Sequence, residues 1–209
     1  IVWGDRVFVT TGNEKTGSRS VHCFDAGTGV QVWKHEIAGA KYRKHQLNSF
    51  ASSTPAADDR NVYVCHVGSD KLHVTAITHD GKREWQTELG AWKSGHGYGV
   101  SPIVHKNSVV IANEHSGQSL LYSLDSRNGK VNWSVPRATK ATYSTPCVYH
   151  RENGSAELIF TNWSQGITAL DPKNGKTNWQ LDVFDKGHVE TSIGSPFVCD
   201  NLVYGTSGW

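Results

Sequence analysis

Methionine is absent from the 209-residue sequence, which therefore has no initiator residue and is expected to be a processed chain or a piece of a longer one. Charged residues make up only 19% of the chain, below the quarter that is usual for a soluble domain. The 21 Lys and Arg nearly balance the 19 Asp and Glu, so no nucleic-acid partner is predicted. No run of 18 apolar residues occurs, and no membrane-spanning helix is predicted.

Cysteines are few and widely spaced, at Cys23, Cys65, Cys147 and Cys199. Without a C-x-x-C pair, they indicate neither a zinc ribbon nor a thioredoxin-like redox site, and four in a chain of this length do not make a disulfide scaffold. Three of them are interpreted as small core residues of strands. None is predicted to be a nucleophile, and the redox compartment stays open.

A repeat of small residue, Asp, Gly and Trp is the main positive feature of the sequence. Its pattern is small-x-Asp-x-x-x-Gly-x-x-x-Trp, one copy is a residue shorter, and successive Trp residues are 52, 48 and 46 positions apart. Self-similarity at a fixed period predicts a repeat architecture. The repeated positions are Cys23, Asp25, Gly29 and Trp33; Ala76, Gly81 and Trp85; Ser123, Asp125, Gly129 and Trp133; and Ala169, Asp171, Gly175 and Trp179.

A second element recurs in alternation with the first: a Ser-Pro or Thr-Pro pair, then two apolar segments separated by a turn. The pairs are Thr54-Pro55, Ser101-Pro102, Thr145-Pro146 and Ser195-Pro196. Together the two elements predict four short strands in each repeat. The last two are expected to be joined by a type I′ turn such as Asn128-Gly129. With β-branched strands and no helical periodicity, the chain is predicted to be all-β.

Four-stranded units of about 40–50 residues are the blades of β-propellers. We expect four antiparallel blades at residues 1–34, 53–86, 101–134 and 145–180, and a half blade at 195–209. The Trp of one blade is expected to lie on the glycine-bearing turn of the next. Since propellers close with whole blades, the chain is expected to be part of a ring of 7–8 blades.

The repeated element resembles the tryptophan-docking motif of the pyrroloquinoline quinone (PQQ)-like β-propellers. That superfamily includes quinoprotein dehydrogenases, the outer-membrane assembly lipoprotein BamB and many other bacterial envelope proteins. The resemblance covers essentially the whole chain. It implies a PQQ-like propeller that is periplasmic, outer-membrane-associated or secreted. Enzymes and non-enzymes share the docking residues, so the resemblance does not choose a function.

Candidate ligand or partner residues are taken from the loops between blades and from those between second and third strands, which share one face of a propeller. Polar loops are also expected simply because they are solvated. No pair among them has the spacing of a known mechanism, and the eleven histidines form no H-E-x-x-H motif, so neither a catalytic residue nor a metal ligand is predicted. The candidates are His45, His96, Tyr98, Glu114, His115, Tyr143, His188 and Glu190.

Two main functions compete. The first is a non-catalytic, BamB-like binding or scaffold module of the cell envelope, with a protein or peptide partner and no cofactor. The second, which the resemblance also implies, is a fragment of a PQQ-dependent dehydrogenase that oxidises alcohols or sugars with PQQ and calcium. The adjacent Cys-Cys pair that such alcohol dehydrogenases carry is absent from this sequence. A third option is a sensory domain fused to a kinase, which only flanking sequence would show.

Overall fold

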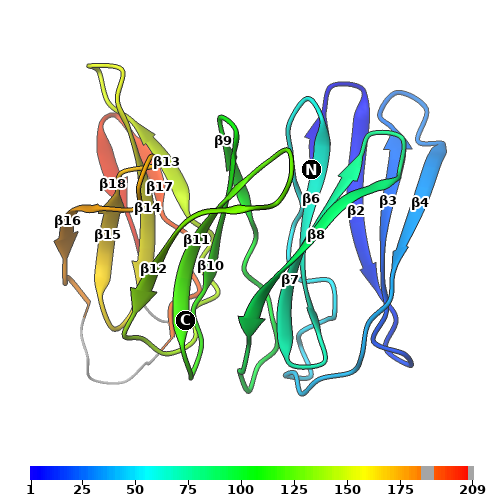
Figure 1. Ribbon diagram of the computed structural model, residues 1–209, viewed down its shortest axis with the longest axis horizontal. Helices are drawn as coiled ribbons and strands as arrows, with labels where there is room; N and C mark the ends of the chain where they lie inside the picture. The colour runs from blue at the N-terminus through cyan, green and yellow to red at the C-terminus, as the bar shows by residue number, and fades with distance from the viewer. Residues whose placement is uncertain (185–190, 207–209) are drawn as a thin grey trace.

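The computed structural model describes residues 1–184 and 191–206. In this part of the chain all regular structure is β, arranged as five antiparallel sheets. The first four follow one another in chain order across the molecule, and the last overlaps the fourth in the view of Figure 1. Four sheets have four strands and the last has two. The prediction of an all-β chain of four-stranded blades is confirmed. Within the same residues, no helix has the length and apolar character needed to cross a membrane.

Within each sheet, every strand pairs with the next one along the chain, so the sheet is a simple meander. The first sheet contains β1 (Val2–Trp3), β2 (Arg6–Gly12), β3 (Arg19–Asp25) and β4 (Gln31–Ile37). The second contains β5 (Ala56–Ala57), β6 (Asn61–Gly68), β7 (Lys71–Thr78) and β8 (Arg83–Ala91). The third contains β9 (Ile103–His105), β10 (Ser108–Asn113), β11 (Ser119–Asp125) and β12 (Val131–Arg137). The fourth contains β13 (Cys147–His150), β14 (Ala156–Asn162), β15 (Gly166–Leu170) and β16 (Thr177–Leu181). The last contains β17 (Phe197–Cys199) and β18 (Leu202–Tyr204).

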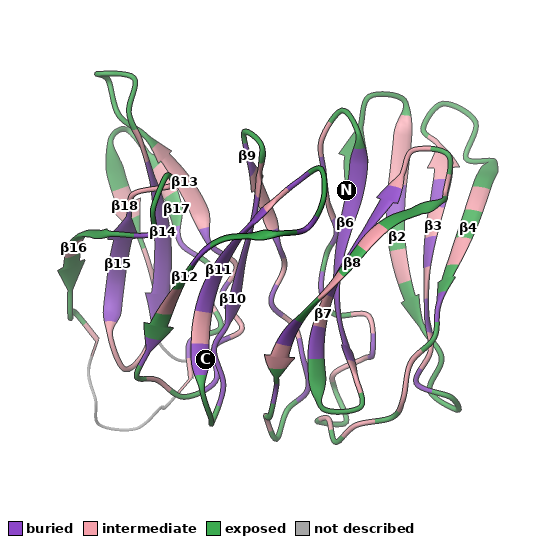
Figure 2. Cartoon of the chain, viewed as in Figure 1, coloured by how far each residue is buried: buried purple, intermediate pink, exposed green. Residues whose placement is uncertain are grey.

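The middle strands carry the core, and the last strand of each sheet is largely exposed (Figure 2). Strands β10 and β14 are buried along almost their whole length, as expected for strands covered on both faces. Strand β12 instead alternates, with Trp133 and Arg137 buried between exposed neighbours. Because this alternation continues beyond the Trp, β12 ends at Arg137, three residues past the expected end of the third blade at 134.

The repeated tryptophans join consecutive sheets. A Cβ atom added at Gly81 would lie 2.9 Å from the ring of Trp33, so the ring rests directly on the backbone of the next sheet's turn. The same contact joins Trp85 to Gly129 and Trp133 to Gly175. In each case the indole Nε1 donates a hydrogen bond to a carbonyl of that turn: to His79 at 2.7 Å, Ser126 at 3.0 Å and Pro172 at 2.9 Å.

The small residue of each repeat pairs with the tryptophan of its own sheet. The pairs are Cys23 with Trp33, Ala76 with Trp85, Ser123 with Trp133 and Ala169 with Trp179. All four small residues are fully buried. A larger side chain there would have to displace the packing of the middle strand, and overpacking of this kind is destabilising.

The turns between third and fourth strands are not of the predicted type I′. That turn needs positive φ at both central residues, whereas in the turn after β11 only Gly129 has it, at 71°. The amide of Gly129 bonds to the carbonyl of Asp125 at 2.9 Å, and the Asp125 carboxylate accepts from the amide of Arg127 at 2.8 Å. The Asp side chain therefore stabilises a right-handed turn that ends in one left-handed glycine, with a bulge beside it.

Candidate functional site

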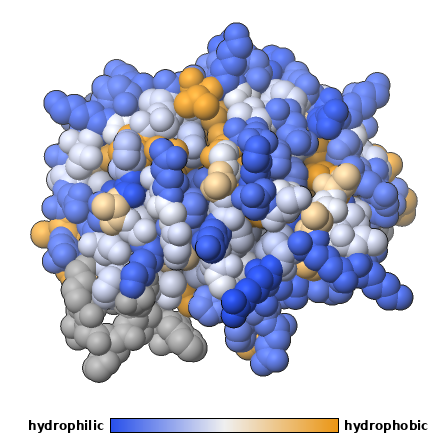
Figure 3. All heavy atoms as spheres, turned by 60° about the horizontal axis from the view of Figure 1, so that its bottom comes forward, coloured by the Kyte–Doolittle hydropathy of each residue, from blue (hydrophilic) through white to orange (hydrophobic). Residues whose placement is uncertain are grey.

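One face of the molecule is built from the loops between sheets, at 38–55, 92–102 and 138–146, and from the turns that follow second strands. We call it the loop face; it lies at the bottom of Figure 1, and Figure 3 brings it forward as a mainly hydrophilic surface. Backbone hydrogen bonds join neighbouring loops, from His45 to His96 at 3.0 Å and from Tyr143 to Ser192 at 2.8 Å. The loops therefore hold one another in place.

Three of the predicted residues lie together on the loop face. The rings of His45 and His96 are 5.7 Å apart between centroids, and those of His96 and Tyr143 are 6.2 Å apart. The Tyr143 hydroxyl and the Ser94 hydroxyl are 2.5 Å apart. Burial raises the pKa of Tyr143, while its hydrogen bond to Ser94 opposes that shift. Side chains from three consecutive blades' loops thus form one cluster.

Sequence reasoning missed Leu47, which lies beside this cluster. Its backbone amide donates to the His45 ring at 3.2 Å, and its side chain is 87% exposed, the most exposed of the large hydrophobic residues described. A lone leucine in a run of polar residues was the available signal. We call His45, Leu47, His96 and Tyr143 the anchor patch.

Three other predicted residues, Tyr98, Glu114 and His115, are buried. Tyr98 packs edge-on against Trp92 at 5.7 Å, and burial raises its pKa well above the ordinary value. Burial also lowers the pKa of His115, which favours its neutral form. These side chains lie beneath the loop face rather than on it. The remaining two candidates, His188 and Glu190, fall outside the described residues.

Glu114 belongs to a buried network between the third and fourth blades. Its Oε1 accepts from Arg137 Nε at 2.9 Å, and its Oε2 accepts from Asn162 Nδ2 at 3.2 Å. Arg137 Nη1 also donates to the Thr168 hydroxyl at 3.1 Å. Burial raises the pKa of Glu114, and the bonds from Arg137 and Asn162 oppose that effect. Both oxygens of this carboxylate are therefore used in holding two blades together.

A calcium-bound quinone would need free ligands at this face. Within residues 1–184 and 191–206, no three His, Cys, Asp or Glu side chains lie close enough to hold a metal ion. The buried carboxylate of Glu114 is taken by protein donors. The described residues thus form no metal site of these ligand types, and Glu114 is not available as a ligand.

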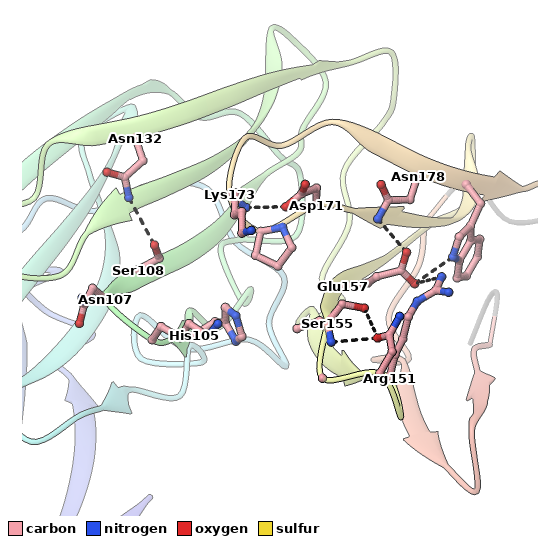
Figure 4. Close-up of a pocket in the computed structure, with 16 residues that line it drawn as sticks. His105, Asn107, Ser108, Asn132, Arg151, Ser155, Glu157, Asp171, Lys173 and Asn178 are labelled. Atoms are coloured by element: carbon pink, nitrogen blue, oxygen red, sulfur yellow. Dashed lines mark hydrogen bonds and ion pairs between the residues drawn. The ribbon is translucent and has the colours of Figure 1, made fainter.

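The opposite face carries a polar cleft of about 900 Å³ between the turns of the third and fourth blades (Figure 4). The side chain of Glu157 at its wall accepts hydrogen bonds from Arg151 at 2.8 Å, Asn178 at 2.7 Å and Trp179 at 3.1 Å. Burial acts to raise the pKa of Glu157, but these bonds outweigh it and the pKa is lowered. The Glu157 carboxylate is therefore held by three donors of its own blade.

A buried histidine below the loop face makes stability depend on pH. Burial, with smaller effects of Arg19 and His73, lowers the pKa of His66 to about 3, against about 6.5 for an unfolded histidine. Between these values the unfolded state binds a proton that the folded state does not, so stability falls as pH falls. We expect about 2 kcal/mol to be lost between pH 8 and pH 5.

Urea denaturation at several pH values would measure this loss. His66→Gln removes the titrating group while keeping a polar side chain, and we expect it to make the pH dependence shallower. An equal pH dependence in the two proteins would assign the acid sensitivity to other groups.

The sheet order and the docking contacts define a repeat protein of the β-propeller class. The family model described as outer membrane protein assembly factor BamB matches residues 17–208, and the chain belongs to this family. Comparison with curated proteins gives no match.

Solved structures support the fold. BamB from Moraxella catarrhalis aligns over 99% of this chain and 53% of its own, with a TM-score of 0.64 and 16% identity. Quinohemoprotein alcohol dehydrogenase from Comamonas testosteroni aligns over 98% of this chain and 38% of its own, with a TM-score of 0.64 and 15% identity. A europium-containing methanol dehydrogenase aligns with a TM-score of 0.60 and 13% identity over 86% of this chain and 40% of its own. The chain thus spans about half the length of the BamB structure.

Proposed function

We propose that the chain is a non-catalytic binding or scaffold module of the bacterial cell envelope, and that it binds a protein or peptide partner through the loop face. The anchor patch carries this proposal. It combines the largely exposed Leu47 with the rings of His45, His96 and Tyr143. Backbone hydrogen bonds join the loops that carry these residues to neighbouring loops. Rigid aromatic and apolar anchors within a polar rim are the composition of protein-binding hot spots. Membership of the BamB family is consistent with a protein partner in the envelope.

The test is site-specific photocrosslinking in envelope extract with the full-length protein. A crosslinking residue at position 47 is expected to capture a specific partner, while the same residue at position 131 is not. Val131 is a matched control, since it is also apolar and 48% exposed but lies on β12 outside the loop face. With the partner purified, Leu47→Glu is expected to weaken binding at least about tenfold. Equal capture at positions 47 and 131 would contradict the proposal.

A dehydrogenase is the second candidate, favoured by the equal TM-scores of BamB and the quinohemoprotein. Its test is reconstitution of the full-length protein with PQQ and calcium, followed by dye reduction with a panel of alcohols and sugars. Reduction above the level without PQQ would favour this second function.

We further propose that the chain forms four blades and a half blade of a ring of 7–8 blades. Apolar side chains are exposed on the first and last sheets, with Val2 at 66%, Phe197 at 57% and Leu202 at 59%. In the interior, the equivalent strands are covered by the neighbouring blade. Further blades at both ends would cover these side chains in the same way, and hydrogen exchange of β1 and β18 should slow in the longer protein.

A further inference from the structure

Positive charge is concentrated in the loops that build the loop face. The loops at 38–55, 92–102 and 138–146 contain five Lys and Arg residues and no Asp or Glu, although the whole chain has 21 Lys and Arg against 19 Asp and Glu. The sequence at 182–190 instead has three acidic residues and one Lys, so the excess of positive charge belongs to the first three loops. The five cations are Lys41, Arg43, Lys44, Lys93 and Lys140.

Aromatic packing accounts for the exposure of three of these cations. The rings of Tyr42 and Trp92 lie 5.7 Å apart between centroids, and both pack in the hydrophobic core. Lys41 and Arg43 flank Tyr42 and are exposed, and Lys93, which follows Trp92, is exposed as well. Because the aromatic side chains take the inward positions, their charged neighbours are left in solvent. We call Lys41, Arg43 and Lys93 the basic rim.

The basic rim belongs to the same two loops as most of the anchor patch. These loops are joined by the aromatic contact just described and by two hydrogen bonds to one carbonyl. The amide of His45 and the Nδ2 of Asn48 both donate to the His96 carbonyl, at 3.0 Å and 2.7 Å. The exposed Leu47 lies between these two donors in the chain. The loops therefore present an apolar anchor and three cations on one joined surface.

The acids around the loop face do not neutralise the basic rim. Within residues 1–184 and 191–206 its three cations form no ion pair. Of the acids in the turns after the second strands of blades 1 to 3, Glu14 is paired with Lys44 at 3.2 Å, and Glu114 is buried in the network with Arg137. Asp70 is the remaining exposed acid of these turns. One negative charge beside three positive charges leaves a surface that is positive overall.

We propose that the partner segment bound at the loop face is acidic: a stretch of chain rich in Asp and Glu that contacts the basic rim and places an apolar side chain against Leu47. This inference rests on the proposed function, which is partner binding through the anchor patch. Complementary charge favours the correct partner and speeds its association, while an apolar anchor supplies binding energy at the centre of an interface. Three cations on a chain with a net charge of +2 are too few for a nucleic-acid footprint.

Labelled poly-L-glutamate is the probe for the charge preference, titrated against the full-length protein and followed by fluorescence anisotropy. The test variant combines Lys41→Glu, Arg43→Glu and Lys93→Glu. We expect it to bind the probe at least about tenfold more weakly than the parent protein. Absence of binding to the parent protein would overturn the proposal.

The matched control reverses three exposed lysines of the opposite face, as Lys106→Glu, Lys130→Glu and Lys173→Glu. It changes the net charge by the same amount, and we expect it to weaken binding of poly-L-glutamate less than about threefold. Equal weakening by the two variants would show general charge attraction and would overturn the proposal. Binding of phosphatidylglycerol vesicles without binding of poly-L-glutamate would assign the basic rim to a membrane surface and would also overturn it.

The partner captured by the crosslinking residue at position 47 gives a readout that separates this inference from the proposed function. Mass spectrometry of the crosslinked peptide is expected to find more Asp and Glu than Lys and Arg. A specifically captured partner whose peptide has no such excess would overturn the acidic segment and leave the proposed function standing. Equal capture at positions 47 and 131 would instead contradict the proposed function itself.

Discussion

Arg137→Met is expected to lower the free energy of unfolding by about 3–5 kcal/mol, the usual cost of leaving one charge of a buried pair alone. Glu114 would lose the donor to its Oε1 and remain 2% exposed between two blades. Thr168 would also lose the bond that it accepts from the guanidinium. Urea denaturation followed by tryptophan fluorescence would measure the change.

Two further proteins make this test specific. Lys34→Met breaks the Lys34–Glu36 pair, whose side chains are 42% and 72% exposed, and we expect a loss below about 1 kcal/mol. Replacing both members of the buried pair, as Arg137→Met with Glu114→Leu, should recover much of the stability, because no buried charge is left unpaired. A single variant as stable as the parent would mean that Glu114 is not held as an ion between the blades.

Trp133→Ala is expected to lower the free energy of unfolding by about 3–5 kcal/mol, the range for truncation of a buried aromatic side chain. The ring is 8% exposed, lies on Gly175 of the next blade and donates to the Pro172 carbonyl. The variant loses both interactions, and the buried area of the ring, at the junction of the third and fourth blades. The measurement is again urea denaturation.

The control for a tryptophan outside a junction is Trp3→Ala, since Trp3 is 40% exposed on β1 and its removal should lower the free energy of unfolding much less.

The junction of the third and fourth blades can also be probed from the glycine side. Gly175 and Gly29 both have φ of 71°, but a Cβ at Gly175 would lie 2.8 Å from Trp133, whereas one at Gly29 would meet nothing within 4 Å. Gly29→Ala should therefore cost only the left-handed strain, about 1–2 kcal/mol, and Gly175→Ala should cost more. Equal losses of unfolding free energy in the two variants would contradict the prediction that Gly175 is required for packing of Trp133.

The fold could be predicted because the same sequence pattern recurs in each blade. The Trp, the Gly and the small residue opposite the Trp have to satisfy the same contact at every junction, so they recur at a regular spacing that can be read without a structure. The turn geometry was predicted less well. An Asn-Gly pair favours a type I′ turn, but the carboxylate of Asp125, four residues before Gly129, accepts from the amide of Arg127 and stabilises another conformation.

The candidate site could be predicted only in part. His45, His96 and Tyr143 meet because they occupy loops that a propeller brings together. Glu114 and His115 also sit in such a loop, yet they are buried, because Arg137 on the extended end of β12 and Asn162 on β14 cover Glu114. Those partners are 23 and 48 residues away, and no local pattern records a pairing at that distance. Burial of a loop residue depends on what neighbouring blades place above it.

The docking contact has a direction, since each of the three junctions between the four-stranded blades passes a tryptophan from the earlier blade to a glycine turn of the later one. Such an interface is heterologous: its two halves are different surfaces, and an inner blade carries one of each. The Trp–Gly contact itself therefore does not restrict which blade follows which. Gene duplication or deletion of one whole unit would leave this contact intact, so proteins built this way can change their number of blades during evolution while keeping a single type of docking contact.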